Sequence, residues 1–127
     1  MPTNVKDLLA AANAEVPRVT PEEAQRMAVD QNAVIVDVRD LTELQTSGKI
    51  PGSVHIPRGM LEFRADADTQ YHDSNLRKDR PVILHCASGG RSALAGQTLK
   101  QMGYTQVYNL GGFKDWVDAG GDVEKTA

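Results

Sequence analysis

The hydrophobic pattern of the chain contains two almost continuous apolar runs, AVIVDV at 33–38 and PVILH at 81–85. Such runs, rich in β-branched residues, are typical of strands that are buried on both faces, as in a parallel sheet covered by helices. Shorter apolar stretches at 54–56 and 107–108 predict two further strands. Residues 58–80 are mostly polar and charged, which predicts a surface excursion.

Helix-start signals lie between these apolar runs. Thr20, Pro21 and Glu23 form a capping-box pattern and predict a helix that continues to about residue 30. A similar pattern at 40–43 predicts a short helix that stops at Gly48. Residues 5–14 contain Ala and Leu and predict an opening helix before Pro17, and further helices are predicted from 92 to 103 and after the glycines at 111–112.

Strands and helices therefore alternate, which predicts an α/β fold: an open, mainly parallel five-stranded sheet with helices on both faces. At 127 residues the chain is expected to form one domain over 1–127, with its core at about 18–121 and an N-terminal helix at 5–14. In such sheets ligands bind beyond the carboxyl ends of the strands, where Asp37 and Cys86 are predicted to lie. Phe113 and Trp116 are spaced to share one helical face and are predicted to belong to the core.

Charge and composition exclude several function classes. The formal net charge is −3, so no nucleic-acid partner is expected, because binding phosphates needs a basic face. No run approaches the roughly 20 apolar residues of a membrane-spanning helix, and residues 1–7 lack the pattern of a signal peptide. A cytoplasmic location without a membrane partner is therefore expected. His55 and His72 lie far apart in sequence and have no second ligand at metal-binding spacing, so no metal site is expected.

Cys86, the one cysteine of the chain, ends a predicted strand, and a loop precedes the next predicted helix. The loop consists of small residues: Ala87, Ser88, Gly89 and Gly90. Small residues let the backbone turn tightly, so that successive N–H groups face one central anion, and the helix start adds its own unpaired N–H groups. Arg91 adds a permanent cation. In such surroundings the pKa of a cysteine falls, and its thiolate is a nucleophile.

Each of these residues also has a structural interpretation. Free cysteine is among the most buried residue types, so Cys86 is either a core thiol or a reactive one, and the flanking glycines and arginine favour the second. Arg91 is either an anion clamp or one partner of a salt bridge, and its position favours the clamp. Ser92 is expected mainly to start the helix. His85 and Cys86 are adjacent on a strand, so their side chains point to opposite faces, which argues against a Cys–His catalytic pair. Arg58, after another predicted strand, is expected to border the pocket.

Four ordered motifs resemble the rhodanese-like domain family from residue 20 to about residue 121. They are VDVR at 36–39 with Glu43, GKIPGSVHIP at 48–57, the Cys86 loop, and NLGGF at 109–113 with Trp116. The resemblance implies a sulfurtransferase that moves a sulfane sulfur from thiosulfate or a persulfide to a thiol or cyanide through a Cys86 persulfide. It implies no cofactor, a small sulfur-donor anion, a thiol acceptor or a sulfur-relay protein as partners, and bracing roles for Asp37 and Arg39.

The resemblance also assigns roles to the loop. Cys86 and Arg91 would be catalytic, and the substrate-binding residues would be Ala87, Ser88, Gly89, Gly90, Ser92 and Arg58. Four residues separate Cys86 from Arg91, as in rhodanese sulfurtransferases, whereas phosphatases of this fold and related arsenate reductases have five. The loop interior is neutral, so thiosulfate is expected to be a poor surrogate for the real donor. The alternatives are a non-catalytic module that binds a partner or senses oxidants and, third, a phosphatase or arsenate reductase.

Overall fold

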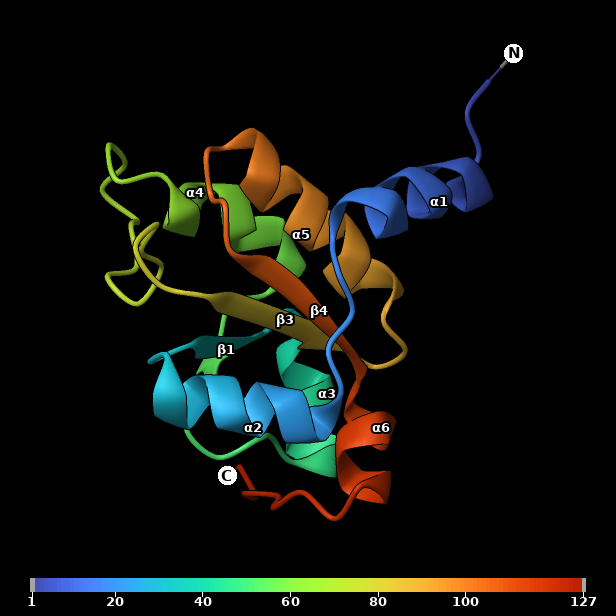
Figure 1. The fold of residues 1–127 in the computed structure, drawn as a ribbon, viewed down its shortest axis with the longest axis vertical. Coiled ribbons are helices and arrows are strands. Elements are labelled where there is room, and N and C mark those ends of the chain that lie inside the picture. Colours follow the sequence, from blue (N-terminus) through green and yellow to red (C-terminus); the bar gives the residue numbers. More distant parts are fainter. Residues whose placement is uncertain (1, 127) are drawn as a thin grey trace.

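The computed structural model describes residues 2–126, which form one parallel sheet with helices on both faces (Figure 1). The strands are β1 (Val34–Asp37), β2 (Val54–His55), β3 (Val82–Cys86) and β4 (Val107–Gly112). The helices are α1 (Val5–Glu15), α2 (Pro21–Asp30), α3 (Leu41–Ser47), α4 (Leu61–Ala65), α5 (Gly90–Gln101) and α6 (Phe113–Asp118), with a 3₁₀ turn, η1, at Arg58–Met60. The strand order is β2-β1-β3-β4, and every pairing is parallel.

The predicted α/β architecture is confirmed, but the predicted number of strands is wrong, because the sheet has four strands rather than five. The nearest approach to a fifth strand is the segment 17–19, which passes β4 and forms a single bridge between Arg18 and Asn109. Val19 N donates to Asn109 O at 3.1 Å, and Asn109 N donates to Pro17 O at 2.9 Å. Pro17 has no N–H with which to extend the ladder, and α2 begins at Pro21, so the pairing ends after one bridge.

Two hydrophobic clusters hold the helices to the sheet. On one face α4 and α5 pack over the sheet, with Leu61, Leu84 and Leu99 among the buried residues. On the other face α2 and α6 pack against it, with Phe113 7% and Trp116 4% exposed, as the sequence predicted. Figure 1 shows α1, α4 and α5 on one side of the sheet and α2, α3 and α6 on the other. No helix within residues 2–126 has the length and apolar character needed to cross a membrane.

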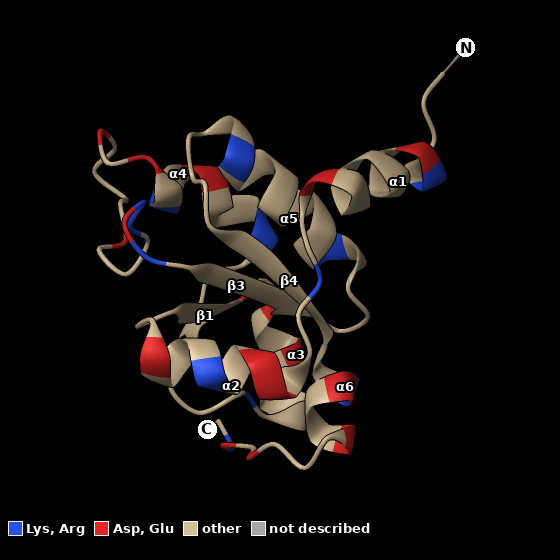
Figure 2. Ribbon diagram, viewed as in Figure 1, with Lys and Arg blue, Asp and Glu red and all other residues tan. Residues whose placement is uncertain are grey.

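The predicted helix-start signals are confirmed where the capping residues meet the backbone. The Thr20 hydroxyl accepts from Glu23 N at 3.1 Å, and the Glu23 carboxylate accepts from Thr20 N at 2.8 Å. Acidic side chains mark α2, α3 and α6 and, on the other side of the sheet, α1 and α4, with basic side chains among them (Figure 2).

The parallel arrangement brings the carboxyl ends of β1, β3 and β4 together. Asp37 pairs with His85, and Cys86 pairs with Gly112, so β4 runs four residues beyond the predicted 107–108. α5 begins at Gly90 rather than at Ser92, because Gly89 takes a left-handed φ of 105° that turns the chain into the helix. The loop after Cys86 is therefore only three residues long before the helix begins.

Candidate active site

The Cys86 sulfur lies in a backbone cradle formed by the turn into α5. Gly89 N donates to Cys86 Sγ at 3.0 Å, and Ser92 Oγ lies 3.4 Å from the same sulfur. A side chain at Gly89 would lie 3.2 Å from Gly111 Cα and would be strained by the positive φ. A Cβ at Gly112 would lie 2.4 Å from the Ala87 carbonyl oxygen. Glycine at these places lets β4 and the loop approach closely enough to aim an amide at the sulfur.

The burial of Cys86 and its hydrogen bonds act in opposite directions on its ionisation. Burial of the thiol opposes ionisation, but the Ser92 hydroxyl and the backbone amides of Ser92, Gly89 and Ser88 outweigh it and lower the pKa of Cys86. Cys86 is 1% exposed, and one side of it belongs to the hydrophobic core, whereas the adjacent Ala87 and Ser88 are exposed. The sulfur is therefore neither an isolated core thiol nor an open surface group: it lies beneath the loop, with amide hydrogens facing it.

Arg91 forms a two-bond ion pair with Glu43 of α3, and this pair borders the loop. The two guanidinium nitrogens each donate to a Glu43 carboxylate oxygen at 2.8 Å. The Arg91 bonds lower the pKa of Glu43 to about 2, and the same pair raises the pKa of Arg91, so both groups stay charged across the physiological range. The electrostatic influence of Cys86 also reaches Arg91. Arg91 is thus one partner of a salt bridge, and its charge also favours an anion on the Cys86 sulfur. The geometry therefore agrees both with the salt-bridge interpretation and with the anion-clamp interpretation of Arg91.

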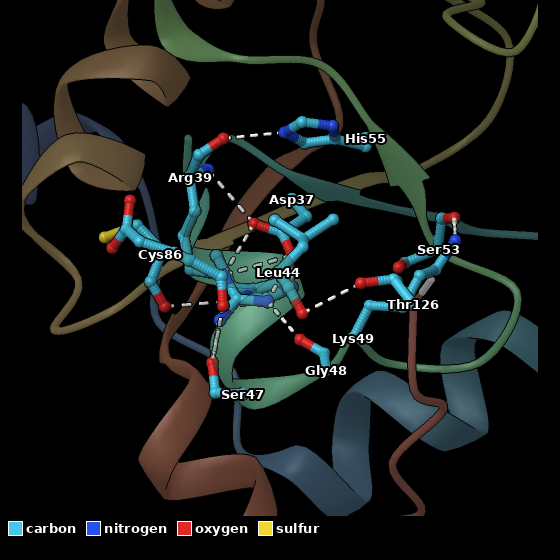
Figure 3. Close-up of polar contacts among 12 residues, drawn as sticks. Asp37, Arg39, Leu44, Ser47, Gly48, Lys49, Ser53, His55, Cys86 and Thr126 are labelled. Carbon is cyan, nitrogen blue, oxygen red and sulfur yellow. Dashed lines mark hydrogen bonds and ion pairs between the residues drawn. The ribbon is translucent and has the colours of Figure 1, made fainter. Parts of the chain in front are cut away.

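A buried charge network lies behind the loop on the other face of β3. Asp37 accepts from Arg39 Nη2 at 2.7 Å, and Arg39 also donates to Ser47 Oγ and Gly48 O (Figure 3). Burial opposes the ionisation of Asp37, but the hydrogen bonds from Arg39 and the charge of His85 lower the pKa of Asp37 overall. The predicted bracing role of Asp37 and Arg39 matches this geometry, because they join the end of β1 to the end of α3.

His85 belongs to this network and not to the sulfur site. Its Nε2 lies 3.6 Å from Asp37 Oδ2, and its ring stacks on Phe113 with the centroids 6.1 Å apart. Burial lowers the pKa of His85 despite the opposing charge of Asp37, so the ring is neutral near pH 7. The expectation that His85 and Cys86 point to opposite faces is confirmed, because their side chains pack in different surroundings. A catalytic Cys–His pair is therefore not formed.

The structure does not bring Arg58 into contact with the loop. Its guanidinium donates to Glu62 at 2.9 Å and to Thr98 Oγ1 at 3.2 Å. Thr98 lies about 9 Å along α5 from Ser92, at about 1.5 Å rise per residue. The surface hollow that reaches the loop is instead a cavity of about 370 Å³. Its walls are Arg39, Thr42, Glu43, Thr46, Ser47, Ala87, Phe113 and Lys114.

The histidines outside β3 bind backbone oxygens. His55 Nε2 lies 2.7 Å from Arg39 O, and His72 Nε2 lies 3.3 Å from Leu76 O. Among residues 2–126 no group of three His, Cys, Asp or Glu side chains comes together in a way that would hold a metal ion.

Two residues of the site were not recognised as such from the sequence. Glu43 was expected only as a helix cap and as part of a motif, yet it is the ion-pair partner of Arg91. Asn109 belonged to a motif without an assigned role, yet its side chain bonds Ser92, Gly89 and Gly111. Their positions in the sequence were the available signal, because Glu43 follows the predicted strand at 33–38 and Asn109 follows the one at 107–108. The carboxyl ends of parallel strands meet at one edge of the sheet, where ligands bind.

Comparison with known proteins places this site in a family. A family model of the rhodanese-like domain matches residues 20–119. The thiosulfate sulfurtransferase GlpE of Pseudomonas savastanoi pv. phaseolicola is 38% identical over 104 residues, covering 80% of this chain and 88% of that protein. The uncharacterised protein YqhL of Bacillus subtilis is 39% identical over 87 residues, covering 68% of this chain. The chain spans only 62% of the length of YqhL.

A solved structure extends the comparison to almost the whole chain. A protein of unknown function from Rhodopseudomonas palustris, described as a possible tyrosine phosphatase, has a TM-score of 0.89 and 38% identity. The match covers 98% of this chain and 96% of that chain. Together with the match of the family model, the order of the four motifs and the Cys86 loop, this likeness leads to one conclusion. The chain belongs to the family of rhodanese-like domains.

Proposed function

We propose that the chain is a sulfurtransferase that carries sulfane sulfur as a persulfide on Cys86. The observation that carries the proposal is the Gly89 amide, which donates to Cys86 Sγ at 3.0 Å within a loop that leaves four residues between Cys86 and Arg91. An amide cradle beneath a cation favours a thiolate over a thiol and favours a persulfide anion in the same way. The likeness to a thiosulfate sulfurtransferase supports the same reaction class.

The reaction has two displacement steps, each with a sulfur atom as the transferred group. The Cys86 thiolate attacks the outer sulfur of a donor such as thiosulfate, the bond between the two donor sulfurs breaks, and sulfite leaves with the electron pair of that bond. The product is the Cys86 persulfide anion. A thiolate or cyanide then attacks the outer sulfur of that persulfide, the new sulfur–sulfur bond breaks, and the Cys86 thiolate is regenerated. No net oxidation occurs in either step.

The loop and Arg91 would stabilise charge in both steps. The amides of Ser88, Gly89 and Ser92 face the sulfur and need no rearrangement as negative charge builds up there. Arg91 keeps its charge because it is paired with Glu43, and the pair supplies a positioned cation rather than a free one. Since two of the five Arg91 N–H donors are already used by Glu43, a persulfide or polysulfide donor is favoured over a doubly charged thiosulfate.

The phosphatase description of the structural relative does not transfer to this chain. The tetrahedral phosphate of a phosphatase substrate needs a cradle of amides on a longer loop, whereas Ala87–Gly90 is the whole segment between Cys86 and Arg91 here. Cys86 also lies 1% exposed beneath that loop, which suits the addition of one sulfur atom better than the entry of an aryl phosphate. A sulfur donor and an acceptor thiol, or a sulfur-relay protein, are therefore the proposed partners.

Mass measurement of the intact protein tests the proposal directly. After incubation with a sulfane-sulfur donor, we expect the wild type to gain the mass of one sulfur, and Cys86→Ser to gain none. Because Cys86 is the one cysteine of the chain, the site of addition is unambiguous. Subsequent addition of cyanide should release thiocyanate and restore the original mass.

The alternative outcome identifies the runner-up function. If no donor adds sulfur to the folded wild type, while a partner protein binds equally well to the wild type and to Cys86→Ser, the chain is a binding module and the proposal is wrong. Turnover of aryl phosphate by the wild type, lost in Cys86→Ser, would instead support a phosphatase.

A further inference from the structure

The Asn109 side chain joins the end of β4 to the loop after Cys86 and to the first turn of α5. Its Nδ2 donates to Gly89 O at 3.1 Å, and its Oδ1 accepts from Gly111 N at 2.8 Å and from Ser92 Oγ at 2.7 Å. Asn109 is fully buried, and so is Ser92. The Asn109 side chain therefore holds together the loop after Cys86, the end of β4 and the first turn of α5.

The orientation of this amide follows from its backbone partners. Gly111 N–H can only donate, so the Asn109 atom that faces it is the oxygen, and Gly89 O can only accept, so the atom that faces it is the nitrogen. The oxygen is thus fixed on the side where Ser92 lies. Since that oxygen has no proton, the Ser92 hydroxyl must donate to it.

The proton count of Ser92 then constrains Cys86. A serine hydroxyl has one proton, and here it is directed to Asn109, so the lone pairs of Ser92 Oγ face Cys86 Sγ at 3.4 Å. A neutral Cys86 thiol fits this arrangement, because its S–H donates to Ser92 Oγ. A thiolate keeps the Gly89 amide as a donor but is opposed at this contact, because Ser92 Oγ presents a lone pair to it.

We propose that Asn109 is a positioning residue that controls the charge state of Cys86 through Ser92, in support of the sulfurtransferase function proposed above. While Cys86 is a thiol, Asn109 holds the Ser92 proton. When the thiol proton leaves to solvent, or when Cys86 becomes a persulfide anion, the Ser92 hydroxyl rotates and donates to sulfur. Asn109 Oδ1 then keeps Gly111 N–H as its remaining partner.

Other charged groups do not account for such a coupling. Arg91 on α5 interacts electrostatically with Cys86, but its guanidinium bonds Glu43. Among residues 2–126 it has no hydrogen bond to Asn109 or Ser92. The Arg18 guanidinium lies beside Gly89 and Gly111, and the Asp115 carboxylate lies beside Gly111 and accepts from Gly112 N. Among residues 2–126 neither group hydrogen-bonds Asn109, Ser92 or Cys86. The charges of Asp37 and Arg39 and the neutral ring of His85 belong to the opposite face of β3.

The test is a double-mutant cycle on the ionisation of Cys86. The ultraviolet absorbance of the thiolate is followed against pH, with Cys86→Ser as the blank, for the wild type, Asn109→Asp, Ser92→Ala and the double variant. A carboxylate accepts the Ser92 proton more strongly than an amide does, so Asn109→Asp should raise the titration midpoint by about one pH unit, equivalent to about tenfold less thiolate below the midpoint. Ser92→Ala should also raise the midpoint, because the thiolate loses a donor.

The cycle separates a signal through Ser92 from a simple effect of charge. In the Ser92→Ala background, Asn109→Asp should shift the midpoint by less than half as much, since no hydroxyl connects the two groups. Asn32→Asp adds the same charge at an exposed position before β1, at the opposite end of the sheet, and should leave the midpoint unchanged. Equal shifts of Asn109→Asp in both backgrounds would overturn the proposal.

A measurement on the wild type keeps the proposal testable if Asn109→Asp does not fold. In NMR spectra the side-chain amide of Asn109 and the backbone amide of Gly111 should shift with the same pH midpoint as Cys86, and again on persulfide formation, while the side chain of Asn32 should not. Signals of Asn109 that ignore the Cys86 titration contradict the coupling. The absorbance titration and the pH dependence of the NMR signals follow the thiol alone, so a wild type that gains no sulfur in the mass experiment refutes the sulfurtransferase proposal, while these two titrations still decide the present one.

Discussion

At the scale of single residues, the ion pair of Glu43 and Arg91 is the clearest example of a side chain with two tasks. Glu43 Oε2 accepts from Asp40 N at 2.9 Å and so caps α3, and the same carboxylate binds Arg91 of α5. The side chains are 32% and 38% exposed, so solvent screens much of their attraction. The pair is therefore expected to position the cation near the loop more than to stabilise the fold.

The substitution Glu43→Gln keeps an oxygen for the cap but removes the charge. Because the folded pKa of Glu43 is lowered from 4.5 to about 2, the pair stabilises the fold fully above about pH 4.5, and this contribution is lost as the pH falls toward about 2. We expect Glu43→Gln to lower the free energy of unfolding by about 1 kcal/mol or less at neutral pH, with the gap to the wild type closing toward pH 2. Urea titrations across this range measure the gap. Glu22→Gln, which removes a charge from an exposed position on α2, is the control, and a gap that persists at about pH 2 would rule out the ion pair as its cause.

At the scale of elements, α5 is placed by a close contact with the segment that follows α1. Gly96 lies in the middle of α5, where a Cβ would come within 2.9 and 3.0 Å of the two Val16 methyl groups and within 3.3 Å of a Val107 methyl. Glycine is normally unfavourable in a helix interior, so its presence here reflects packing rather than helix propensity. The close approach places Val16 beside α5 and Val107 of β4 in one cluster of buried side chains.

Gly96→Ala should therefore destabilise the protein, although alanine favours helix. We expect a loss of about 1–3 kcal/mol, because Val16 is 1% exposed and cannot move away into solvent. In the double variant with Val16→Ala, the loss should be at least about 1 kcal/mol smaller than the sum of the single losses. Unfolding followed by the fluorescence of Trp116, the single tryptophan, measures these values. Gly59→Ala, whose Cβ would meet nothing within 4 Å, is the control, and a Gly96→Ala protein as stable as the wild type would contradict the packing argument.

At the scale of the whole molecule, a buried charge network ties the sheet to the layer of α3 and α6. Arg39 is 2% exposed and bonds Asp37 and Gly48 O (Figure 3). Its guanidinium carbon lies 4.3 Å from the centre of the Phe113 ring. The network thus connects the end of β1 with α3 and α6. Asp37 pairs with His85, the residue before Cys86, so the network supports the end of β3 from which the loop begins.

Removal of the cation alone should be costly. In Arg39→Met the Asp37 carboxylate stays buried without its partner, and we expect a loss of about 3–5 kcal/mol in the free energy of unfolding. The double variant with Asp37→Asn should recover part of this loss, because no charge is then left buried. Arg77→Met breaks an exposed pair with Asp79 and should cost less than about 1 kcal/mol. Urea titrations measure both losses. If Arg39→Met and Arg77→Met lower the free energy of unfolding equally, the burial of the Arg39 pair does not explain its contribution to stability.

The sequence by itself determined the features that depend on neighbouring residues. The apolar runs at 33–38 and 81–85 became β1 and β3, the pattern at Thr20 and Glu23 became a cap, and the spacing from Cys86 to Arg91 defined the loop. These features are local because a strand, a cap or a tight turn is specified by side-chain alternation, a hydrogen bond over three residues or a glycine backbone. Their agreement with the family motifs made the fold class and Cys86 predictable.

Only the tertiary structure decided which distant residues meet. Glu43 binds Arg91 across 48 residues, and Asn109 binds Ser92 across 17, whereas Arg58 bonds Thr98 and stays away from the loop. The chain forms four strands because Pro17 and the start of α2 limit the segment beside β4 to one bridge. Such contacts depend on how the carboxyl ends of parallel strands and the first turns of helices are brought together in space, and no periodicity along the chain encodes that arrangement.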